Sequence, residues 1–153
     1  MRQSESAVAV SASGYSVAPL SEEERDRLAS RLGEEERRIL LHRGTEHPFC
    51  GGLLHNDKTG VYVCRLCGLP LFHSRAKFDS GTGWPSFCEP FDKDHIVYLR
   101  DDSLGMVRTE IRCKRCDGHL GHVFPDGPPP SGLRYCLNSV AMEFIAEDGS
   151  GAA

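Results

Sequence analysis

The segment Cys113–Cys136 reads CKRCDGHLGHVFPDGPPPSGLRYC and decides how the rest of the chain is organised. It begins with two cysteines separated by two residues, passes through His119 and His122, and ends on a single cysteine shortly after Arg134. The spacing of the first two cysteines lets one tight turn present two thiolates to a single metal ion. The segment therefore predicts half of a metal site, followed by polar and nucleophilic side chains.

A second pair, Cys64 and Cys67, lies in the sequence VCRLCG. Together with Cys113 and Cys116 it provides four thiolates, which match a closed tetrahedral zinc site of the structural kind. Forty-five residues separate the two pairs, more than in a compact zinc ribbon. We therefore expect one zinc ion per chain, bound so that it joins two distant parts of a domain.

Composition excludes several classes of protein. The length of 153 residues suits one domain, and the net charge of −4 with a pI near 6.0 provides no basic field for nucleic acid or a membrane surface. No apolar run approaches a membrane span, and the short apolar stretch 7–10 does not predict a secretory signal. Seven cysteines, with Cys50, Cys88 and Cys136 left as thiols outside the zinc site, are typical of a reducing, cytoplasmic protein.

The N-terminal part predicts helices. Ser21 and Glu24 have the spacing of a capping box, which predicts a helix over residues 22–32 that Gly33 ends. A second short helix is expected over residues 34–42, and we interpret both as packing on the domain. The expected organisation is a disordered tail (1–19), a helical segment (20–44), one main domain (45–147) and a flexible C-terminus (148–153).

From residue 60 onward the pattern changes to short β-type runs between turn residues. Thr109 and its apolar neighbours alternate with charged residues over 106–112, as in a half-buried antiparallel strand, and Val140, Met142 and Phe144 alternate similarly. No strand–helix–strand rhythm occurs, so a parallel sheet is not expected. The prediction is a mainly antiparallel β domain with an N-terminal helical extension. The predicted strands cover residues 61–64, 95–100, 106–112, 119–124 and 137–145.

The segment Asp79–Phe87, DSGTGWPSF, predicts a rigid loop around the only tryptophan. Its glycines permit unusual backbone angles and Pro85 stiffens the turn. A single tryptophan is more often a core residue than a ligand contact. Because loops on a stable scaffold commonly carry binding groups, we slightly favour a binding role for Trp84.

Cys136 is the best candidate for a nucleophile. A nearby cation such as Arg134 lowers the pKa of a thiol and so favours the reactive thiolate. The alternative is a small, buried apolar residue on a strand. His119 and His122 are candidates for a general acid, for metal ligands or for structural histidines.

These residues together resemble a known family. The chain from about Glu46 to Phe144 closely resembles the B-type methionine sulfoxide reductases, which reduce methionine-R-sulfoxide. The resemblance implies two antiparallel sheets, arranged like a tent or barrel, with a structural zinc. The matching motifs, in the family's order, are the two CxxC pairs, Ser80–Phe87, Arg108–Glu110, Gly118–Gly127 and Leu133–Asn138.

The resemblance also implies roles for individual residues. Cys136 would attack the sulfoxide sulfur, form a sulfenic acid and release methionine. Trp84 would hold the substrate's methyl group. The remaining implied site residues are His119, His122 and Asn138, which would orient and protonate the sulfoxide oxygen, and Phe124 and Arg134, which would contact the substrate.

The chain departs from the family in one respect. Many members carry a resolving cysteine between the glycines of the tryptophan loop, where this chain has Thr82. Because some members use a cysteine at the position of Cys50, we favour Cys50 as the thiol that forms a disulfide with Cys136. Cys88 comes next and an external thiol third, and thioredoxin is the expected reductant of the disulfide.

Two other classes of protein compete with this interpretation. A zinc-ribbon module for interaction or nucleic-acid binding would explain the four paired cysteines, but it leaves the tryptophan loop and Cys136 without a role and requires a basic face. A catalytic zinc hydrolase would use the two histidines as ligands of an activating metal. We expect a monomeric reductase without nucleic-acid or membrane partners.

Overall fold

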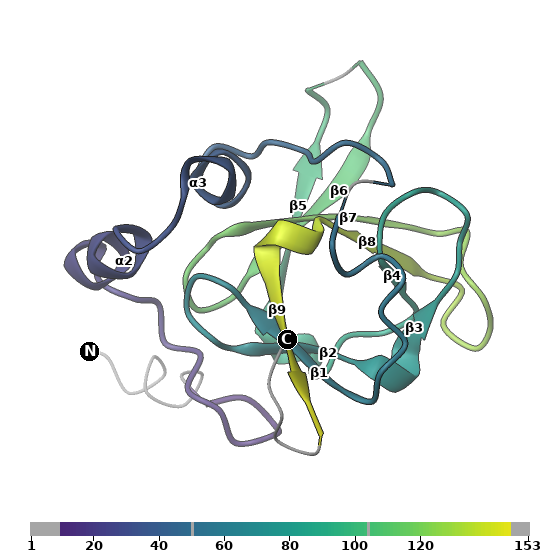
Figure 1. The fold of residues 1–153 in the computed structure, drawn as a ribbon, viewed down its shortest axis with the longest axis horizontal. Coiled ribbons are helices and arrows are strands. Elements are labelled where there is room, and N and C mark those ends of the chain that lie inside the picture. Colours follow the sequence, from purple (N-terminus) through teal and green to yellow (C-terminus); the bar gives the residue numbers. More distant parts are fainter. Residues whose placement is uncertain (1–9, 50, 104, 148–153) are drawn as a thin grey trace.

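The computed structural model describes residues 10–49, 51–103 and 105–147. The chain forms two antiparallel sheets, with the helices beside them at the N-terminal side (Figure 1). The smaller sheet has the strand order β2–β1–β9. The predicted fold class, mainly β with two antiparallel sheets and an N-terminal helical extension, is confirmed. The strands of the smaller sheet are β1 (Gly60–Cys64), β2 (Pro70–His73) and β9 (Met142–Ala146).

The larger sheet has six strands in the order β3–β4–β8–β7–β6–β5, all antiparallel. Consecutive strands β5 to β8 are neighbours, whereas β3 and β4 add to the far edge of the sheet. Three 3-10 turns, Ser74–Ala76, Lys93–His95 and Ser139–Ala141, connect the strands. The strands are β3 (Lys77–Phe78), β4 (Ser86–Phe87), β5 (Ile96–Asp101), β6 (Arg108–Cys113), β7 (His119–Phe124) and β8 (Arg134–Leu137).

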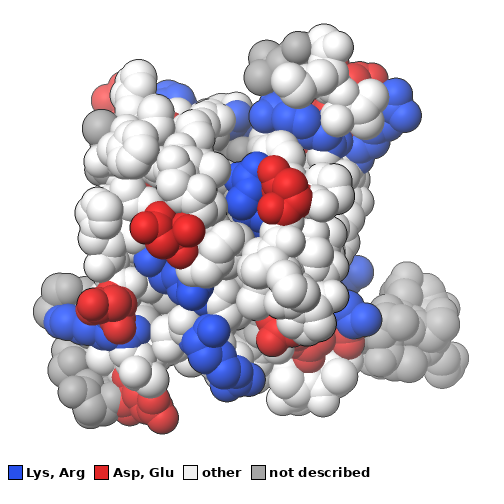
Figure 2. All heavy atoms as spheres, turned by 90° about the vertical axis from the view of Figure 1, so that its right-hand side faces the viewer, with Lys and Arg blue, Asp and Glu red and all other residues white. Residues whose placement is uncertain are grey.

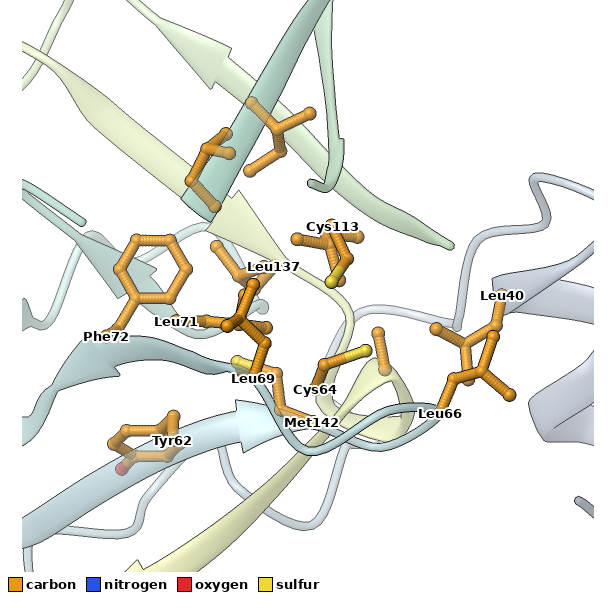
Figure 3. Packing of buried hydrophobic residues seen from close by; sticks show 14 of the residues in the cluster. Leu40, Tyr62, Cys64, Leu66, Leu69, Leu71, Phe72, Cys113, Leu137 and Met142 are labelled. Carbon is orange, nitrogen blue, oxygen red and sulfur yellow. The ribbon is translucent and has the colours of Figure 1, made fainter. Parts of the chain in front are cut away.

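Aromatic side chains from both sheets meet in the core. The ring of Phe72 on β2 stacks on Phe87 of β4, with centroids 4.4 Å apart, and Tyr62 of β1 meets the same ring edge-on at 5.0 Å. All three side chains are fully buried. Figure 3 shows Tyr62 and Phe72 in one cluster with aliphatic residues and with Cys64 and Cys113, two of the four paired cysteines. Burial of these large rings holds the sheets together.

Two predicted strands differ from the structure. The run 137–145 is not one strand, because the turn Ser139–Ala141 carries the chain from the larger sheet to the smaller one. In β6, Glu110 was expected to face solvent and Val107 the core, but Glu110 is 1% exposed and Val107 is 62% exposed. The reason is that both faces of the larger sheet are covered at Glu110, whereas Val107 precedes the strand.

The helices α2 (Glu22–Ala29) and α3 (Glu34–Leu40) are present but shorter than predicted. The capping box of Ser21 with Glu24 is formed. Gly33 does not end α2, which already stops at Ala29; it is instead the N-cap of α3. Neither of the helices in the described part of the chain has the length and apolar character needed to cross a membrane.

The prediction of a disordered tail is wrong for residues 10–19. Val17 is 2% exposed, and the Ser11 hydroxyl lies 2.8 Å from Nε2 of the buried His95. The backbone N–H of Ser13 donates to the carboxylate of Asp92 at 2.8 Å. These contacts span about eighty residues of sequence, so no local pattern predicts them. Residues 1–9 and 148–153 of the predicted flexible ends lie outside the described residues.

Replacing Val17 tests this anchoring. Val17→Ala removes two buried methyl groups and should lower the free energy of unfolding by about 1–2 kcal/mol. Val10→Ala is the matched control, since Val10 is 57% exposed and should change stability little. Chemical denaturation of the two variants measures both values. Equal stability of the two variants would contradict an anchored tail.

Candidate active site

The four paired cysteines come together in one cluster. Their sulfur atoms all lie within 4.8 Å of one another, and the Cys64–Cys116 and Cys67–Cys113 sulfurs are 3.5 and 3.4 Å apart. In a regular tetrahedral zinc site with Zn–S bonds of about 2.3 Å, the sulfurs lie ~3.8 Å apart. The cluster can therefore hold one tetrahedral metal ion, as the sequence predicts.

This cluster joins the two sheets. Cys64 is the last residue of β1 in the smaller sheet, and Cys113 is the last residue of β6 in the larger one. A tight turn follows each strand and returns the second cysteine to the cluster, closed by N–H···O bonds from Gly68 to Cys64 and from Asp117 to Cys113. Helix α2 covers the second turn, where Arg25 Nε donates to the Cys116 carbonyl at 2.6 Å.

The second site lies on the larger sheet, where one row of side chains crosses four strands. Glu110 of β6 pairs with His122 of β7, His122 pairs with Cys136 of β8, and Cys136 pairs with Ser86 of β4. Directly opposed residues of neighbouring antiparallel strands project to the same face of a sheet. The strand register therefore brings an acid, an imidazole, a thiol and a hydroxyl into one line.

A pocket of about 100 Å³ opens beside Cys136. Five of the predicted site residues line it: Trp84, His122, Phe124, Cys136 and Asn138. The other lining residues are Thr45, Arg108, Gly121 and Leu137.

The segment before residue 50 holds the tryptophan loop. Trp84 Nε1 donates to the Glu46 carbonyl at 3.0 Å, and the Phe49 N–H donates to the Gly83 carbonyl at 2.7 Å. Gly83 has φ +95°, and a Cβ there would lie 2.7 Å from Pro48. Glycine is therefore needed for both the backbone angle and the close contact.

Asn138 is fixed from two sides. Its Oδ1 accepts the N–H of Glu46 at 3.0 Å, and its Nδ2 donates to the Leu120 carbonyl at 3.2 Å. A side-chain amide has two N–H donors, so one remains for a substrate. Glu46 thus connects Asn138 to Trp84 through its backbone.

His119 and His122 each bond to a buried carboxylate. His122 Nε2 lies 2.7 Å from Asp101 Oδ2, and His119 Nδ1 lies 2.7 Å from Glu110 Oε2. Since a carboxylate accepts, these nitrogens carry the protons, which leaves Nδ1 of His122 and Nε2 of His119 as acceptors in the neutral rings. Burial lowers the pKa of both histidines, and the neighbouring carboxylates only partly oppose it.

The Cys136 thiol differs from its sequence expectation. Burial raises its pKa to about 11, and the charge of Arg134 lowers it only in part. Arg134 is occupied elsewhere: its Nε donates to Asp126 at 2.9 Å and its guanidinium stacks 4.4 Å above the ring of Phe124. The resting group is therefore a thiol, and its proton has to be removed during attack.

Two predicted site residues, His119 and Arg134, are not part of the pocket lining. His119 is 2% exposed and its ring centroid lies 5.7 Å from that of His122, behind the pocket lining. Arg134 flanks Phe124. Cys50 lies outside the described residues. The other candidate resolver, Cys88, is a half-buried free thiol just past β4.

Sequence reasoning missed the acids behind the histidines and two of the lining residues. Arg108 and Glu110 were assigned to the predicted strand 106–112 and to a family motif, but were given no role in the site. Asp101, Thr45 and Glu46 carry no sequence signal of their own, because their contacts depend on the strand register and on the segment that crosses the sheet.

Comparison with known proteins defines the class. The SelR domain model matches residues 32–146, and the chain belongs to the SelR domain family. Proteins named "Peptide methionine sulfoxide reductase MsrB" are its curated relatives: that of Caulobacter vibrioides is 60% identical over 139 residues, which cover 91% of this chain and 87% of the relative. That of Xylella fastidiosa is 61% identical over 131 residues, covering 86% and 84%. That of Escherichia coli is 55% identical over 119 residues, covering 78% and 87%. The resemblance to the B-type methionine sulfoxide reductases is confirmed.

The competing classes gain no support. The SelR match spans most of the chain, including the segments that a zinc-ribbon module leaves without a role. The face shown in Figure 2 carries both Lys or Arg and Asp or Glu side chains, so it is not uniformly basic. Among the described residues, the group of side chains placed to hold a metal ion is the four-cysteine cluster, which includes neither His119 nor His122.

Removing one cysteine tests the cluster. Cys64→Ser should lose the bound metal and much of the folding free energy that metal binding contributes, because one of four ligands is gone. Cys88→Ser is the matched control, since Cys88 lies outside the cluster. Elemental analysis gives the metal content and calorimetry the melting temperature. A Cys64→Ser protein with wild-type values for both would show that the cluster does not hold a structural ion.

Proposed function

We propose that this protein reduces methionine-R-sulfoxide to methionine, with Cys136 as the nucleophile. The observation that carries the proposal is the pocket in which the Cys136 thiol lies together with Trp84, His122, Phe124 and Asn138. A volume of about 100 Å³ suits the end of one side chain. The indole and phenyl rings provide apolar walls for the methyl group, and the polar groups suit the sulfoxide oxygen.

The reaction balances with the thiol's own proton. Cys136 Sγ attacks the sulfoxide sulfur, the sulfur–oxygen bond breaks, and the oxygen ends on Cys136 as a sulfenic acid while methionine leaves. His122, the cross-strand neighbour of Cys136, has Nδ1 free to take the thiol proton and deliver it to the sulfoxide oxygen. Asp101 stabilises the imidazolium formed between these transfers, and the remaining N–H of Asn138 orients the oxygen.

The resolving step is also a proposal. A second thiol condenses with the sulfenic acid, with loss of water, to a disulfide. Cys50 is favoured, with Cys88 next. In support, the Phe49 N–H bonds to Gly83 in the tryptophan loop, and a Cβ on Gly51 would lie 2.2 Å from Ser139 Oγ. Both sequence neighbours of Cys50 thus contact segments next to the pocket. A dithiol reductant, thioredoxin, then restores both thiols.

We infer that the ion of the four-cysteine cluster is zinc, because four thiolates in tetrahedral spacing are a typical structural zinc site. Its role is to hold the two sheets together, away from the pocket. The proposed setting is a monomer in the cytoplasm that acts on free or protein-bound methionine sulfoxide. The need for reduced thiols in both sites supports that compartment.

The nucleophile can be tested directly. Cys136→Ser should keep the fold and the metal but lose reduction, because a hydroxyl is a far weaker nucleophile than a thiol near neutral pH. The assay supplies separate R and S epimers of a methionine sulfoxide peptide with dithiothreitol as reductant. Cys88→Ser should keep reduction of the R epimer in this assay. Normal turnover by Cys136→Ser would rule out the assignment.

A single-turnover experiment tests the resolver. Cys50→Ser should still release one equivalent of methionine but stall with thioredoxin as the reductant, because no internal disulfide forms. Peptide mapping after one turnover should find a Cys50–Cys136 disulfide in the wild type. If Cys88→Ser stalls and lacks the disulfide instead, Cys88 is the resolver and the choice of Cys50 is wrong.

A further inference from the structure

A single arginine nitrogen joins the two carboxylates behind the histidines. Nη2 of Arg43 lies 3.4 Å from Asp101 Oδ1 and 3.3 Å from Glu110 Oε1. The side chains of these acids are only 3% and 2% exposed, whereas that of Arg43 is 45% exposed. The cation thus reaches from the surface onto a buried pair of acids, each of which holds one histidine by a 2.7 Å bond.

Two buried like charges beside the same nitrogen oppose each other's ionisation unless a cation lies between them. Arg108 contacts Asp101 at 3.2 Å and Arg112 contacts Glu110 at 2.8 Å. Within the described part of the chain, Arg43 is the arginine whose ion pairs include both acids. It is therefore placed to hold the two carboxylates at a fixed separation.

The N-terminal segment positions this cation. Helix α3 buries Ile39 and Leu40, and a Cβ on Gly118 would lie 3.1 Å from Leu40. The chain then turns through Arg43, whose φ is +59°, and the Gly44 N–H returns to the Arg38 carbonyl at 2.9 Å. A left-handed conformation is unfavourable for a residue with a Cβ, so the surrounding contacts must hold it.

We propose that Arg43 is a positioning residue of the reductase reaction: it bridges Asp101 and Glu110 so that both histidines keep the tautomer and orientation that the reaction needs. The N-terminal segment, which the sequence suggested merely packs on the domain, then takes part in the active site. The kinetic test of this inference rests on the proposed function, whereas the spectroscopic test of the histidine rings does not.

Four variants separate charge from fold. Arg43→Met removes the charge and keeps an unbranched chain of similar length. Arg43→Lys restores a cation, and because one nitrogen makes both contacts, an ammonium can replace it. Arg43→Gly removes the side chain but suits the positive φ, so it remains folded if the methionine variant does not. Arg27→Met is the matched control, since Arg27 is an exposed arginine on α2, away from the pocket.

Two measurements are made on each variant. The first is the single-turnover rate and KM for the R-sulfoxide peptide. The second is the nitrogen-15 spectrum of the histidine rings, which reports the tautomer and hydrogen bond of each ring without any substrate. Because Arg43 touches no substrate, its loss should lower the rate about ten- to a hundredfold with little change in KM.

The expected result is a slow Arg43→Met or Arg43→Gly enzyme with shifted His119 and His122 signals, and near wild-type behaviour of Arg43→Lys and Arg27→Met. Unchanged histidine signals and rate in the folded, uncharged variants would overturn the proposal. The proposal would also be overturned if a folded Arg43→Lys variant did not restore the rate and the histidine signals. If the wild type reduces no sulfoxide, the proposed function fails, but the histidine spectra still decide whether Arg43 holds the two pairs.

Discussion

The constraint on which the structure depends is the four-cysteine cluster at the junction of the two sheets. One pair of cysteines begins at the end of β1 and the other at the end of β6. These two strands belong to different sheets. One tetrahedral ion shared by Cys64, Cys67, Cys113 and Cys116 would fix the position of one sheet against the other. The aromatic core between the sheets then packs against a set geometry. Helix α2 and the preceding Leu20, whose N–H donates to the Arg115 carbonyl, cover the second pair of cysteines. Small β domains gain much of their stability from such a site.

The candidate active site lies on the larger sheet. Strand register alone places Glu110, His122, Cys136 and Ser86 in one row. The histidines are oriented by buried acids, as in other sites where a carboxylate sets the tautomer of an imidazole. Burial keeps Cys136 as a thiol at rest. A protonated thiol suits a reaction in which the sulfoxide oxygen needs a proton at the moment of attack.

The segments outside the sheets complete the site. The stretch after α3 brings Arg43 to the acids, the backbone of Glu46 to Trp84 and Asn138, and Thr45 to the pocket. The backbone groups of Glu46 bond to side chains from far away in the sequence. In the proposed reaction, the N-terminal third is therefore part of the scaffold that holds the site.

The sequence by itself determined the parts that depend on local spacing: the two cysteine turns, the glycine-bounded tryptophan loop, the capped helix after Ser21 and the placing of Cys136 near two histidines. Strand periodicity reports only one buried face, so it could not predict that Glu110 is buried and Val107 exposed. Only the tertiary structure decided the acids behind the histidines, the bridge from Arg43, the anchoring of residues 10–19 and the high pKa of the thiol. Each of these depends on contacts between residues far apart in the chain, or on burial, which no single stretch of sequence encodes.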